Sequence, residues 1–378
     1  MTERPVIADA RRIVVKVGSS SLTDERGEPD VRHLTALVDA LAAARLGGRD
    51  VVLVSSGAMA CGMAPLGLKQ RPRDLADKQA ASSVGQSLLV GRYGSLFARY
   101  GITVGQVLLT VGDVARQDHY RNAQRTFTRL LELGVVPIVN ENDTVATYEI
   151  RFGDNDRLPA LVAHLVGADA LVLLSDVDAL YTAHPDDPSA RRIAEVDDID
   201  ALDIEVGRPG ASVGTGGMAA KLQAAQIATG SGIPVVLGAT ADAADIVSGR
   251  ECGTLFHPTG KRRRRKLLWL AYASQSHGEL VIDDGAVRAL RERQASLLPA
   301  GITGVRGDFH AGDPVRLVAA DGTVVARGLV NYDATEIPAL MGHDTHELAA
   351  TLGEHFEREV VHRDDMILKP PPKGPSGA

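Results

Sequence analysis

Carboxylates and carboxamides crowd into one stretch of the sequence, VNENDTVATYEIRFGDNDRL, which runs from Val139 to Leu158. The apolar run LGVVPIV precedes it and reads as a buried strand, whereas PALVAHLVGA follows it with the spacing of a helix face. Such side chains can hold a polar ligand because they offer several hydrogen-bond acceptors and, in the amides, donors. The polar members of this stretch are Asn140, Glu141, Asn142, Asp143, Glu149, Asp154, Asn155 and Asp156.

A lysine lies within an apolar segment near the N-terminus, RIVVKVGSS. Lys16 must either reach the surface along its aliphatic stem or face a negative partner. A solvated lysine on an edge strand is the plainer alternative, and position alone leaves both open. Gly18 and the serines after it favour a functional role, because glycine allows close approach and backbone amides can hold phosphate oxygens. VSSGAM, which contains Ser56 and Gly57, repeats this design at the next apolar run.

A glycine-rich segment, SVGTGGMAAKLQAA, opens a predicted helix with Lys221 in its first turns. The sequence contains no GxxxxGK[ST] phosphate loop. Gly214, Gly216 and Ala219 fit the GxGxxA dinucleotide pattern, but no predicted strand leads into them, so we discount that pattern. A flexible loop at a helix start is one interpretation. We favour the other, a phosphate clamp with a mobile lysine.

Apolar runs and helical patterns alternate along the first two thirds of the chain. Strands are predicted within Arg12–Ser20, Asp50–Met59, Ile102–Thr110, Val135–Val139 and DALVLLSDVDALYT, and helices over Val31–Gly48, Arg73–Tyr100 and Asp118–Leu133. This alternation predicts an α/β fold, with a mostly parallel sheet sandwiched by helices. In such sheets ligands bind outside the carboxyl ends of the strands, where KVGSS, VSSGA, VNEND and LSDVD all lie. The polar stretch is therefore assigned to a ligand crevice.

The pattern changes after Pro258, where the sequence continues with the basic run TGKRRRRK. From Glu279 onward, short segments with closely spaced turns predict a second, small β-barrel-like domain. The tail, KPPPKGPSGA, is too rich in proline and glycine to pack, and its end is expected to be disordered. We divide the chain of 378 residues into a first domain over 1–258, a basic linker over 259–277, a β domain over 278–362 and a tail over 363–378.

Composition argues against several classes of protein. The formal net charge of −7 disfavours a globally basic nucleic-acid binder. Cys61 and Cys252 have no neighbours at metal-ligand spacing, and a disulfide framework is implausible. The N-terminus lacks the apolar core of a secretory signal, and no apolar run is long enough to span a bilayer. We expect a reduced, soluble, cytoplasmic protein without a membrane partner, in which His119, His164 and His310 are surface or packing residues rather than metal ligands.

Several segments together resemble the glutamate 5-kinases, or gamma-glutamyl kinases, of the amino-acid kinase family: VVKVGSS, VSSGAMACG, VNENDTVATYEIRFGDND, LLSDVDALYT and GTGGMAAKLQAA. QASLLPAGITGVRGDF and VHRDDMIL resemble the PUA domain that many bacterial members carry. The resemblance covers nearly the whole chain. It implies transfer of the γ-phosphoryl group of ATP to the side-chain carboxylate of L-glutamate, the first step of proline biosynthesis. It also implies Mg²⁺ held through ATP rather than by the protein, inhibition by proline, and a homo-oligomer.

The resemblance implies roles for the residues at matching positions. Lys16 and Lys221 would flank the reacting phosphates, with Asp156 holding both lysines. The residues implied to bind L-glutamate are Ser56, Gly57, Asn140, Asp143, Asp154 and Asn155. The residues implied to bind ATP are Lys16, Gly18, Ser19, Ser175, Asp176, Thr215, Gly216, Gly217, Met218, Ala219, Ala220 and Lys221. Threonine is common in the family where this chain has Ser175, so the hydroxyl group is retained.

Two kinds of alternative stay open. Within the same fold, the rivals are N-acetylglutamate kinase, aspartokinase, carbamate kinase and UMP kinase. EIRFGDND favours a free amino acid, because an acetylated substrate would not need acceptors for an ammonium group. The other alternative is an RNA-binding protein that acts through the PUA-like domain. The aromatic content of the chain, 4%, argues against recognition of RNA by base stacking. Binding to the backbone of double-stranded RNA is still compatible with this composition.

Overall fold

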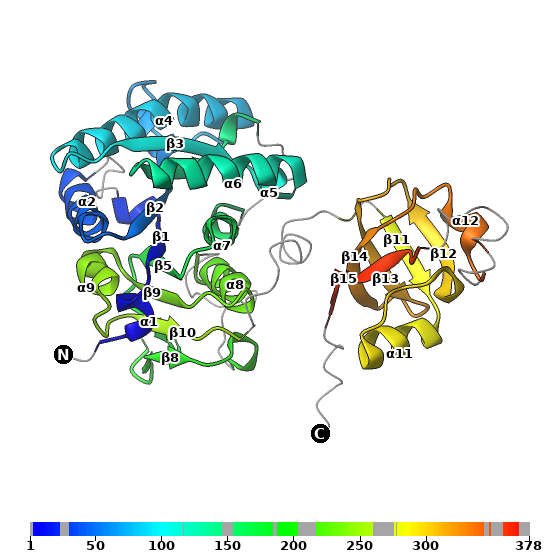
Figure 1. Ribbon diagram of the computed structural model, residues 1–378. Coiled ribbons are helices and arrows are strands. Elements are labelled where there is room, and N and C mark those ends of the chain that lie inside the picture. Colours follow the sequence, from blue (N-terminus) through cyan, green and yellow to red (C-terminus); the bar gives the residue numbers. More distant parts are fainter. Residues whose placement is uncertain are drawn as a thin grey trace. The chain divides into compact units, whose positions relative to one another are not determined.

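The computed structural model describes residues 3–22, 30–115, 117–145, 154–183, 187–202, 217–259, 276, 278–343, 348 and 358–369. The chain forms two compact units, Met1–Arg263 and Arg264–Ala378 (Figure 1). The first unit has a mostly parallel sheet between helices, and the second has a separate small sheet. The fold class predicted from the sequence is therefore confirmed.

The elements of the first unit alternate as the sequence pattern predicts. Its strands are β1 (Arg12–Val17), β2 (Asp50–Ser55), β3 (Val104–Leu109), β4 (Val136–Glu141), β5 (Ala170–Ser175), β6 (Leu180–Tyr181), β7 (Arg192–Ile193), β8 (Glu195–Val196), β9 (Val235–Ala239) and β10 (Thr254–Phe256). Its α-helices are α1 (Pro5–Ala8), α2 (Val31–Leu46), α3 (Ala58–Met63), α4 (Leu75–Ala98), α5 (Val111–Ala115), α6 (Gln117–Glu132), α7 (Asp154–Val166), α8 (Gly217–Gly230) and α9 (Ala243–Ser248). Its 3₁₀ turns are η1 (Ser20–Leu22), η2 (Asp143–Val145), η3 (Ile199–Ala201) and η4 (Thr240–Asp242).

The strands of the main sheet stand in the order β3-β4-β2-β1-β5-β9-β10-β8. From β3 to β9 every pair is parallel, whereas β10 runs antiparallel to β9. Strands β2, β4 and β3 lie on one side of β1, and the chain then crosses over to place β5 on the other side of β1. This reversal is the topological switch point at which parallel sheets bind ligands. It brings the carboxyl ends of β4, β2, β1 and β5 next to one another.

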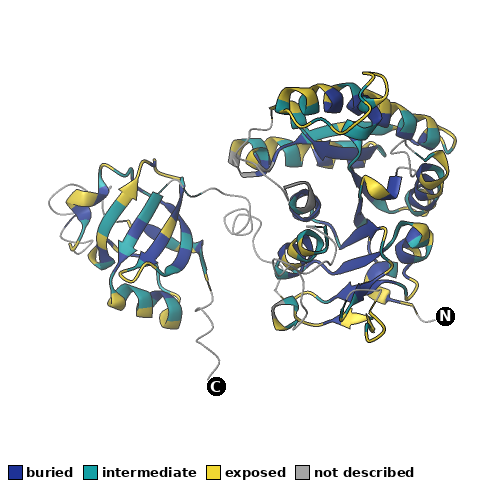
Figure 2. Cartoon of the chain, turned by 180° about the vertical axis from the view of Figure 1, so that it is seen from behind, coloured by how far each residue is buried: buried dark blue, intermediate teal, exposed yellow. Residues whose placement is uncertain are grey.

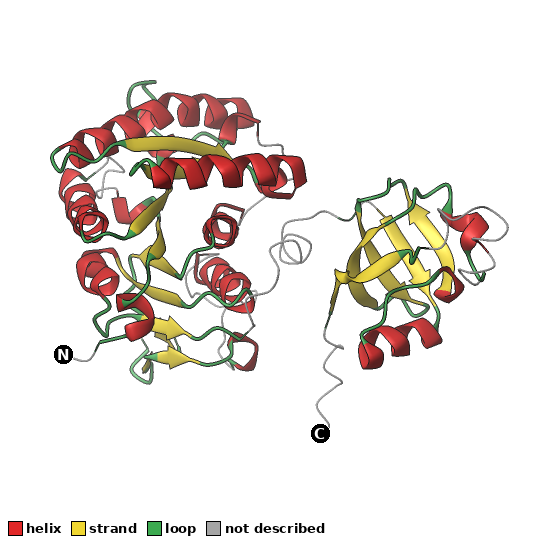
Figure 3. Cartoon of the chain, viewed as in Figure 1, coloured by secondary structure: helices red, strands yellow, loops and turns green. Residues whose placement is uncertain are grey.

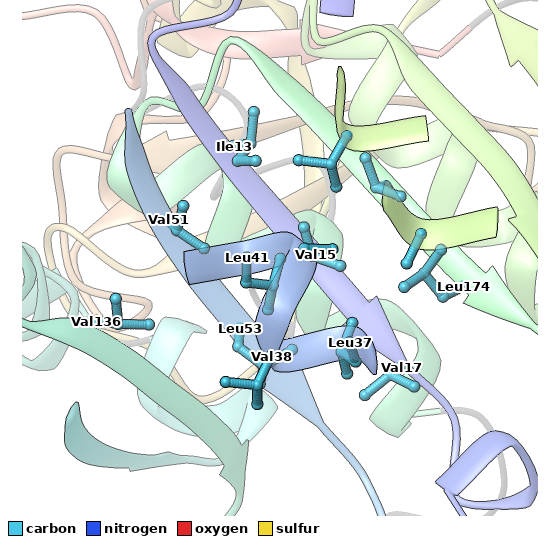
Figure 4. Close-up of a cluster of buried hydrophobic side chains, with 14 of the residues drawn as sticks. Ile13, Val15, Val17, Leu37, Val38, Leu41, Val51, Leu53, Val136 and Leu174 are labelled. Atoms are coloured by element: carbon cyan, nitrogen blue, oxygen red, sulfur yellow. The ribbon is translucent and has the colours of Figure 1, made fainter. Parts of the chain in front are cut away.

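Strand β1 lies in the middle of the sheet, paired with β2 and β5. The edge-strand interpretation of Lys16 is therefore wrong. Because side chains alternate along a strand, Ile13, Val15 and Val17 share one face, and Lys16 points to the opposite face. Figure 4 shows the first face, where these three side chains meet the apolar side of α2. Their burial is complete, so β1 holds its lysine in a rigid frame.

Two layers of helices cover the sheet. Helices α2 and α9 pack together on the face of Ile13, and α7 and α8 pack together on the other (Figure 1). The strands between them are buried, while the helices expose their outer sides (Figure 2). Lys16 thus points toward the layer of α7 and α8, and α7 packs against β1 itself.

Helices α3 and α4 approach so closely that their backbones touch. A Cβ atom on Gly62 would lie 1.9 Å from the carbonyl oxygen of Ala81, and one on Gly85 would lie 1.6 Å from that of Ala58. Neither position has room for a side chain. Helix α4 is also tied to the sheet, because the hydroxyl groups of Ser55 and Tyr93 form a buried hydrogen bond of 2.9 Å. The crossing therefore fixes α4 against the segment that follows β2.

The second unit has its own core and sheet (Figure 3). Its elements are β11 (Gly278–Ile282), α11 (Asp284–Arg293), η6 (Pro299–Gly301), β12 (Ile302–Gly307), β13 (Pro314–Ala319), β14 (Val324–Val330), α12 (Ile337–Leu340) and β15 (Val361–Leu368). The strand order is β12-β11-β13-β14-β15. Strand β15 pairs antiparallel with β14, so the sheet continues past residue 362, where we had placed the domain end.

The glycine crossing makes a prediction for stability. Gly85→Ala should lower the free energy of unfolding by about 1–3 kcal/mol, because the two backbones must separate. Gly91→Ala, on the same helix, is the matched control: a Cβ atom there meets nothing within 4 Å. That change should instead raise stability by about 0.5–1 kcal/mol through helix propensity. Urea unfolding of both variants measures the difference, and equal stabilities would contradict the close crossing.

Candidate active site

Four adjacent strand ends carry the polar residues singled out in the sequence. In sheet order they are Asn140 on β4, Ser56 after β2, Lys16 on β1 and Ser175 on β5. Neighbouring strands lie about 4.8 Å apart, so the row spans about 14 Å. That length suits an elongated ligand or two small ligands placed end to end. Lys16 lies within the row, next to the β5 end.

Lys16 is 5% exposed despite its charge. Its Nζ atom lies at the end of β1 beside Gly18, where a Cβ atom would stand 3.9 Å away. A buried ammonium group is costly unless anionic or polar groups surround it. The side chain therefore places a nearly dry positive charge beside a glycine that leaves space for a ligand.

The segments after β1 and β2 touch each other at Ser19 and Gly57. The amide of Ser56 donates to the carbonyl of Val17 at 3.2 Å, which continues the strand pairing. Gly57 follows with φ of +105°, and a Cβ atom there would lie 3.9 Å from the Cα atom of Ser19. Glycine is required at Gly57 because L side chains rarely adopt this backbone conformation. The tight turn brings both segments to one side of the crevice.

The β5 end joins the start of α8. Ser175 donates its hydroxyl to Asp176 at 2.7 Å, and Thr240 donates to the Ser175 carbonyl at 3.1 Å. The hydrogen bond from Ser175 lowers the pKa of Asp176, and the positive charge of Lys221 lowers it further. Lys221 itself folds back over its helix and donates to the carbonyl of Gly217 at 3.3 Å. A second ammonium group therefore lies near the end of β5.

The β4 end supplies an amide and a carboxyl group. Asn140 is 6% exposed, and its Oδ1 accepts from the amide of Glu141 at 2.9 Å. Asp143 begins η2 and is partly buried. Burial raises the pKa of Asp143, and the nearby Ser82 hydroxyl partly offsets that rise. A carboxylate that has lost much of its water favours a cationic ligand.

Part of the predicted site lies outside the described residues. This applies to Thr215 and Gly216, and to the side chains of Asp154, Asn155 and Asp156; Glu149, another polar member of the stretch, also lies outside the described residues. The backbone of Asp154 opens α7, on the face of the sheet toward which Lys16 points. Met218, Ala219 and Ala220 form the first turn of α8 between Gly217 and Lys221.

Two residues of α4 were missed by the sequence analysis. Ser82 lies next to Asp143, and Gln86 donates to the carbonyl of Glu141 at 3.2 Å. The same Gln86 accepts from Gln106 at 3.2 Å. The available signal was their spacing: polar residues four apart on the core-facing side of a helix have to meet polar partners.

The three histidines lie in different surroundings. His164 is buried, with its ring 6.2 Å from that of Tyr120. His119 contacts Asp113 at 2.9 Å, and His310 pairs with Asp333 at 3.5 Å. Within the described ranges, no group of three or more His, Cys, Asp or Glu residues could hold a metal ion. No helix in that same part of the chain is long and apolar enough to cross a membrane.

The buried carboxyl group predicts a pH-dependent stability. Because the native pKa of Asp143 is raised, the folded chain binds this proton more tightly than the unfolded chain does. The resulting stability is present at acid pH and is lost as the pH rises through the native pKa. Asp143→Asn should therefore be more stable than the wild type at neutral pH, with the gap closing toward acid pH. Calorimetric melting across pH tests this, with the exposed Asp9→Asn as control; a constant gap would contradict it.

Comparisons with known proteins agree across both units. The model of the Amino acid kinase family matches residues 11–238, and that of the PUA domain matches residues 278–352. The glutamate 5-kinases of Streptomyces avermitilis and Streptomyces coelicolor are each 60% identical, over 371 and 370 residues. Both alignments cover 97% of this chain and 99% of the relative. The glutamate 5-kinase of Salinispora arenicola is 59% identical over 367 residues, which cover 97% of this chain and 100% of that protein. With a mostly parallel sheet, two lysines at its switch point and these matches, the chain belongs to the amino acid kinase family and carries a PUA domain.

Proposed function

We propose that the protein phosphorylates the side-chain carboxylate of L-glutamate with ATP and releases L-glutamyl 5-phosphate and ADP. This is the first committed reaction toward proline. The observation that carries the proposal is the row of strand ends, which has a carboxyl group for an ammonium at one end and two lysines toward the other. The high identity to glutamate 5-kinases supports the choice of substrate.

The reaction explains why lysines dominate the site. A glutamate carboxylate has a pKa of about 4.3, so it is ionised at neutral pH and needs no general base. Its oxygen attacks the γ-phosphorus, a new P–O bond forms, and the bond to the bridging oxygen of ADP breaks. The obstacle is that one anion must approach another. Catalysis then consists of positioning and of neutralising charge on the moving phosphoryl group.

The order of the strands supports one arrangement of the two substrates. L-glutamate occupies the β4 and β2 ends, and ATP occupies the β5 end and the start of α8. Lys16 is the cation on β1, between the two substrates, and Lys221 reaches the phosphates from α8. Asp156 holds both lysines in this proposal, which relieves their mutual repulsion.

The β4 end acts as a clamp for the free amino acid. The ammonium group of glutamate binds Asp143, with Asn140 and Asp154 as further acceptors. Ser56 and Asn155 donate to the α-carboxylate, and Gly57 leaves room for it. Glutamate without an acetyl group is favoured over N-acetylglutamate, because only the free amino acid brings an ammonium group to the partly buried Asp143.

The other end of the row fits a Mg²⁺–ATP complex. Its donors are ammonium groups, hydroxyls and backbone amides, which suit phosphate oxygens. Gly18 and Ser19 would hold the phosphates from β1, and Ser175 and Asp176 would hold the nucleotide from β5. The residues from Thr215 to Lys221 complete that side. Mg²⁺ bound to the phosphates supplies charge neutralisation.

Inhibition by proline, assembly and cellular location are part of the same proposal. Proline shares the α-carboxylate and a cationic amino group with glutamate, so we propose that it inhibits the enzyme. A homo-oligomer in the cytoplasm, where ATP and free glutamate are available, completes the proposal. All the chemistry is assigned to the first domain, residues 1–258 in our division.

A second candidate function rests on charges in the PUA domain. Glu279 pairs with Arg306 and Arg316 on its two neighbouring strands, and Arg316 stands directly opposite Arg327. Lys369 comes directly after the end of β15, and its pKa is lowered by burial and then by Arg327 and Arg316. Like charges on opposite strands repel each other. The neighbouring cations Arg316, Arg327 and Lys369 therefore favour an anionic partner. We propose that this partner is the phosphate backbone of double-stranded RNA.

The kinase proposal predicts the effect of removing Lys221. Lys221→Ala should lower kcat on the order of 100-fold or more, because its charge acts mainly on the transition state. The KM for L-glutamate should change little. Steady-state rates of ADP release with varied L-glutamate measure both constants, and exposed Lys69→Ala is the control.

The substrate is tested in the same assay. L-glutamate should support turnover, whereas N-acetylglutamate, aspartate, carbamate and UMP should support little. For the preceding prediction, near-normal turnover of Lys221→Ala would remove Lys221 from the mechanism. Preference for one of the other substrates would overturn the proposal itself.

The RNA candidate predicts a salt-dependent affinity. Binding of a labelled RNA duplex to the full chain should weaken as salt rises, since each phosphate contact releases counterions. Replacing Arg316 and Arg327 together with alanine should reduce the slope of log affinity against log salt by about 2, whereas Arg293→Ala on α11 should change it less. Absence of binding at low salt would exclude this function. An unchanged slope would place the RNA elsewhere, and preference for an acidic protein would point to a different partner.

A further inference from the structure

Ser82 is a buried hydroxyl group that its own helix does not satisfy. The residue is 1% exposed, and its Oγ atom makes no hydrogen bond of normal geometry. Serines in helices commonly donate to a carbonyl of the preceding turn. On the same helix, Ser87 donates to the carbonyl of Val84 at 3.0 Å and Ser95 to that of Gly91 at 2.9 Å. Ser82 departs from this habit, so its hydroxyl is available to a group outside α4.

The group beside it is the carboxyl of Asp143. Helix α4 packs against η2, and the Ser82 hydroxyl is close enough to lower the pKa of that carboxyl. One turn later, Gln86 donates to the carbonyl of Glu141. Ser82 and Gln86 thus form a polar strip on α4 that faces the β4 end. The glycine crossing packs this helix closely against α3.

The Ser82 hydroxyl and burial have opposite effects on the Asp143 carboxyl group. Lys78 lies one turn before Ser82 on α4, and Glu141 ends β4. Burial raises the pKa of Asp143, and the Ser82 hydroxyl lowers it. Burial favours the protonated carboxyl, which cannot bind an ammonium group as an ion pair. A hydroxyl that donates to the carboxylate opposes this effect.

We propose that Ser82 is a positioning residue for the amino-acid substrate: its buried hydroxyl orients the Asp143 carboxylate and keeps it ionised for the substrate ammonium. The inference rests on the proposed function, because it needs Asp143 to bind that ammonium group. Ser82 itself touches no reacting atom. Its neighbour Ser83 is exposed on the other side of α4 and serves as the matched control.

The test is the pH dependence of L-glutamate binding to the full-length protein. Calorimetric titration without nucleotide gives Kd for the wild type, Ser82→Ala and Ser83→Ala from about pH 5 to about pH 8. A neutral hydrogen bond corresponds to about half to one pKa unit. The binding curve of Ser82→Ala should therefore move to higher pH by that amount. Its Kd should be about 3–10-fold weaker on the acid side and nearly unchanged on the alkaline side.

A second readout separates positioning from simple packing. The Ser82 hydroxyl would donate mainly to the ionised Asp143 carboxylate, so Ser82→Ala should lower the melting temperature of the ligand-free protein at alkaline pH and change it little at acid pH. Loss of a packing residue would instead lower the melting temperature equally at all pH values. Ser82→Cys nearly keeps the volume but offers a weak donor, so its binding curve should resemble that of Ser82→Ala. A loss of affinity that is equal at all pH values, or wild-type binding by both variants, would overturn the inference.

The variant Asp143→Asn distinguishes a failure of the Ser82 inference from a failure of the proposed function. If the wild type binds L-glutamate and Asp143→Asn does not, the clamp is supported. An unchanged pH profile of Ser82→Ala would then refute Ser82 alone. If the wild type does not bind L-glutamate, or Asp143→Asn binds it normally, the proposed clamp fails instead.

Discussion

The site depends on one electrostatic constraint, a lysine ammonium held nearly dry at the end of the central strand. Lys16 is kept in the sheet because the alternate residues of β1 are packed completely against α2. The residue is 5% exposed, so its charge has little contact with solvent. The surroundings of Lys16 must therefore be built for negative charge, which explains the glycine beside it and the hydroxyls around it. A sheet with its switch point elsewhere would leave this lysine without a ligand to meet.

A second constraint is steric and controls the other end of the row. Gly62 and Gly85 allow α3 and α4 to cross with backbones in contact, and Tyr93 ties α4 to the end of β2. The strip of Ser82 and Gln86 is thereby fixed behind the β4 end. The proposed amino-acid clamp would thus rely on a helix that contributes none of the proposed substrate contacts. Gly62 and Gly85, which have no side chain, would then link helix packing to substrate binding.

Asp143 lowers the stability of the folded chain at neutral pH, and in the proposed function the same carboxylate binds the substrate ammonium group. Its partial burial raises its pKa, so ionising this carboxyl group costs more in the folded chain than in the unfolded chain. The unfavourable charge strengthens the attraction for an ammonium group in a site with little water. Lys16 is also buried, and under the proposed function a phosphate group would meet its charge at the centre of the row.

The sequence by itself determined the fold class, the order of strands and helices, and the polar ends where ligands bind, because hydrophobic period and glycine positions are local signals. It also identified Lys16, Asp143, Ser175 and Lys221 as candidates. Only the tertiary structure decided that β1 is central, that β4, β2, β1 and β5 are neighbours, and that Ser82 meets Asp143. These facts depend on contacts between residues far apart in the chain, such as Gly85 against Ala58. No local pattern encodes them, since strand order and helix crossing are settled by packing the whole domain.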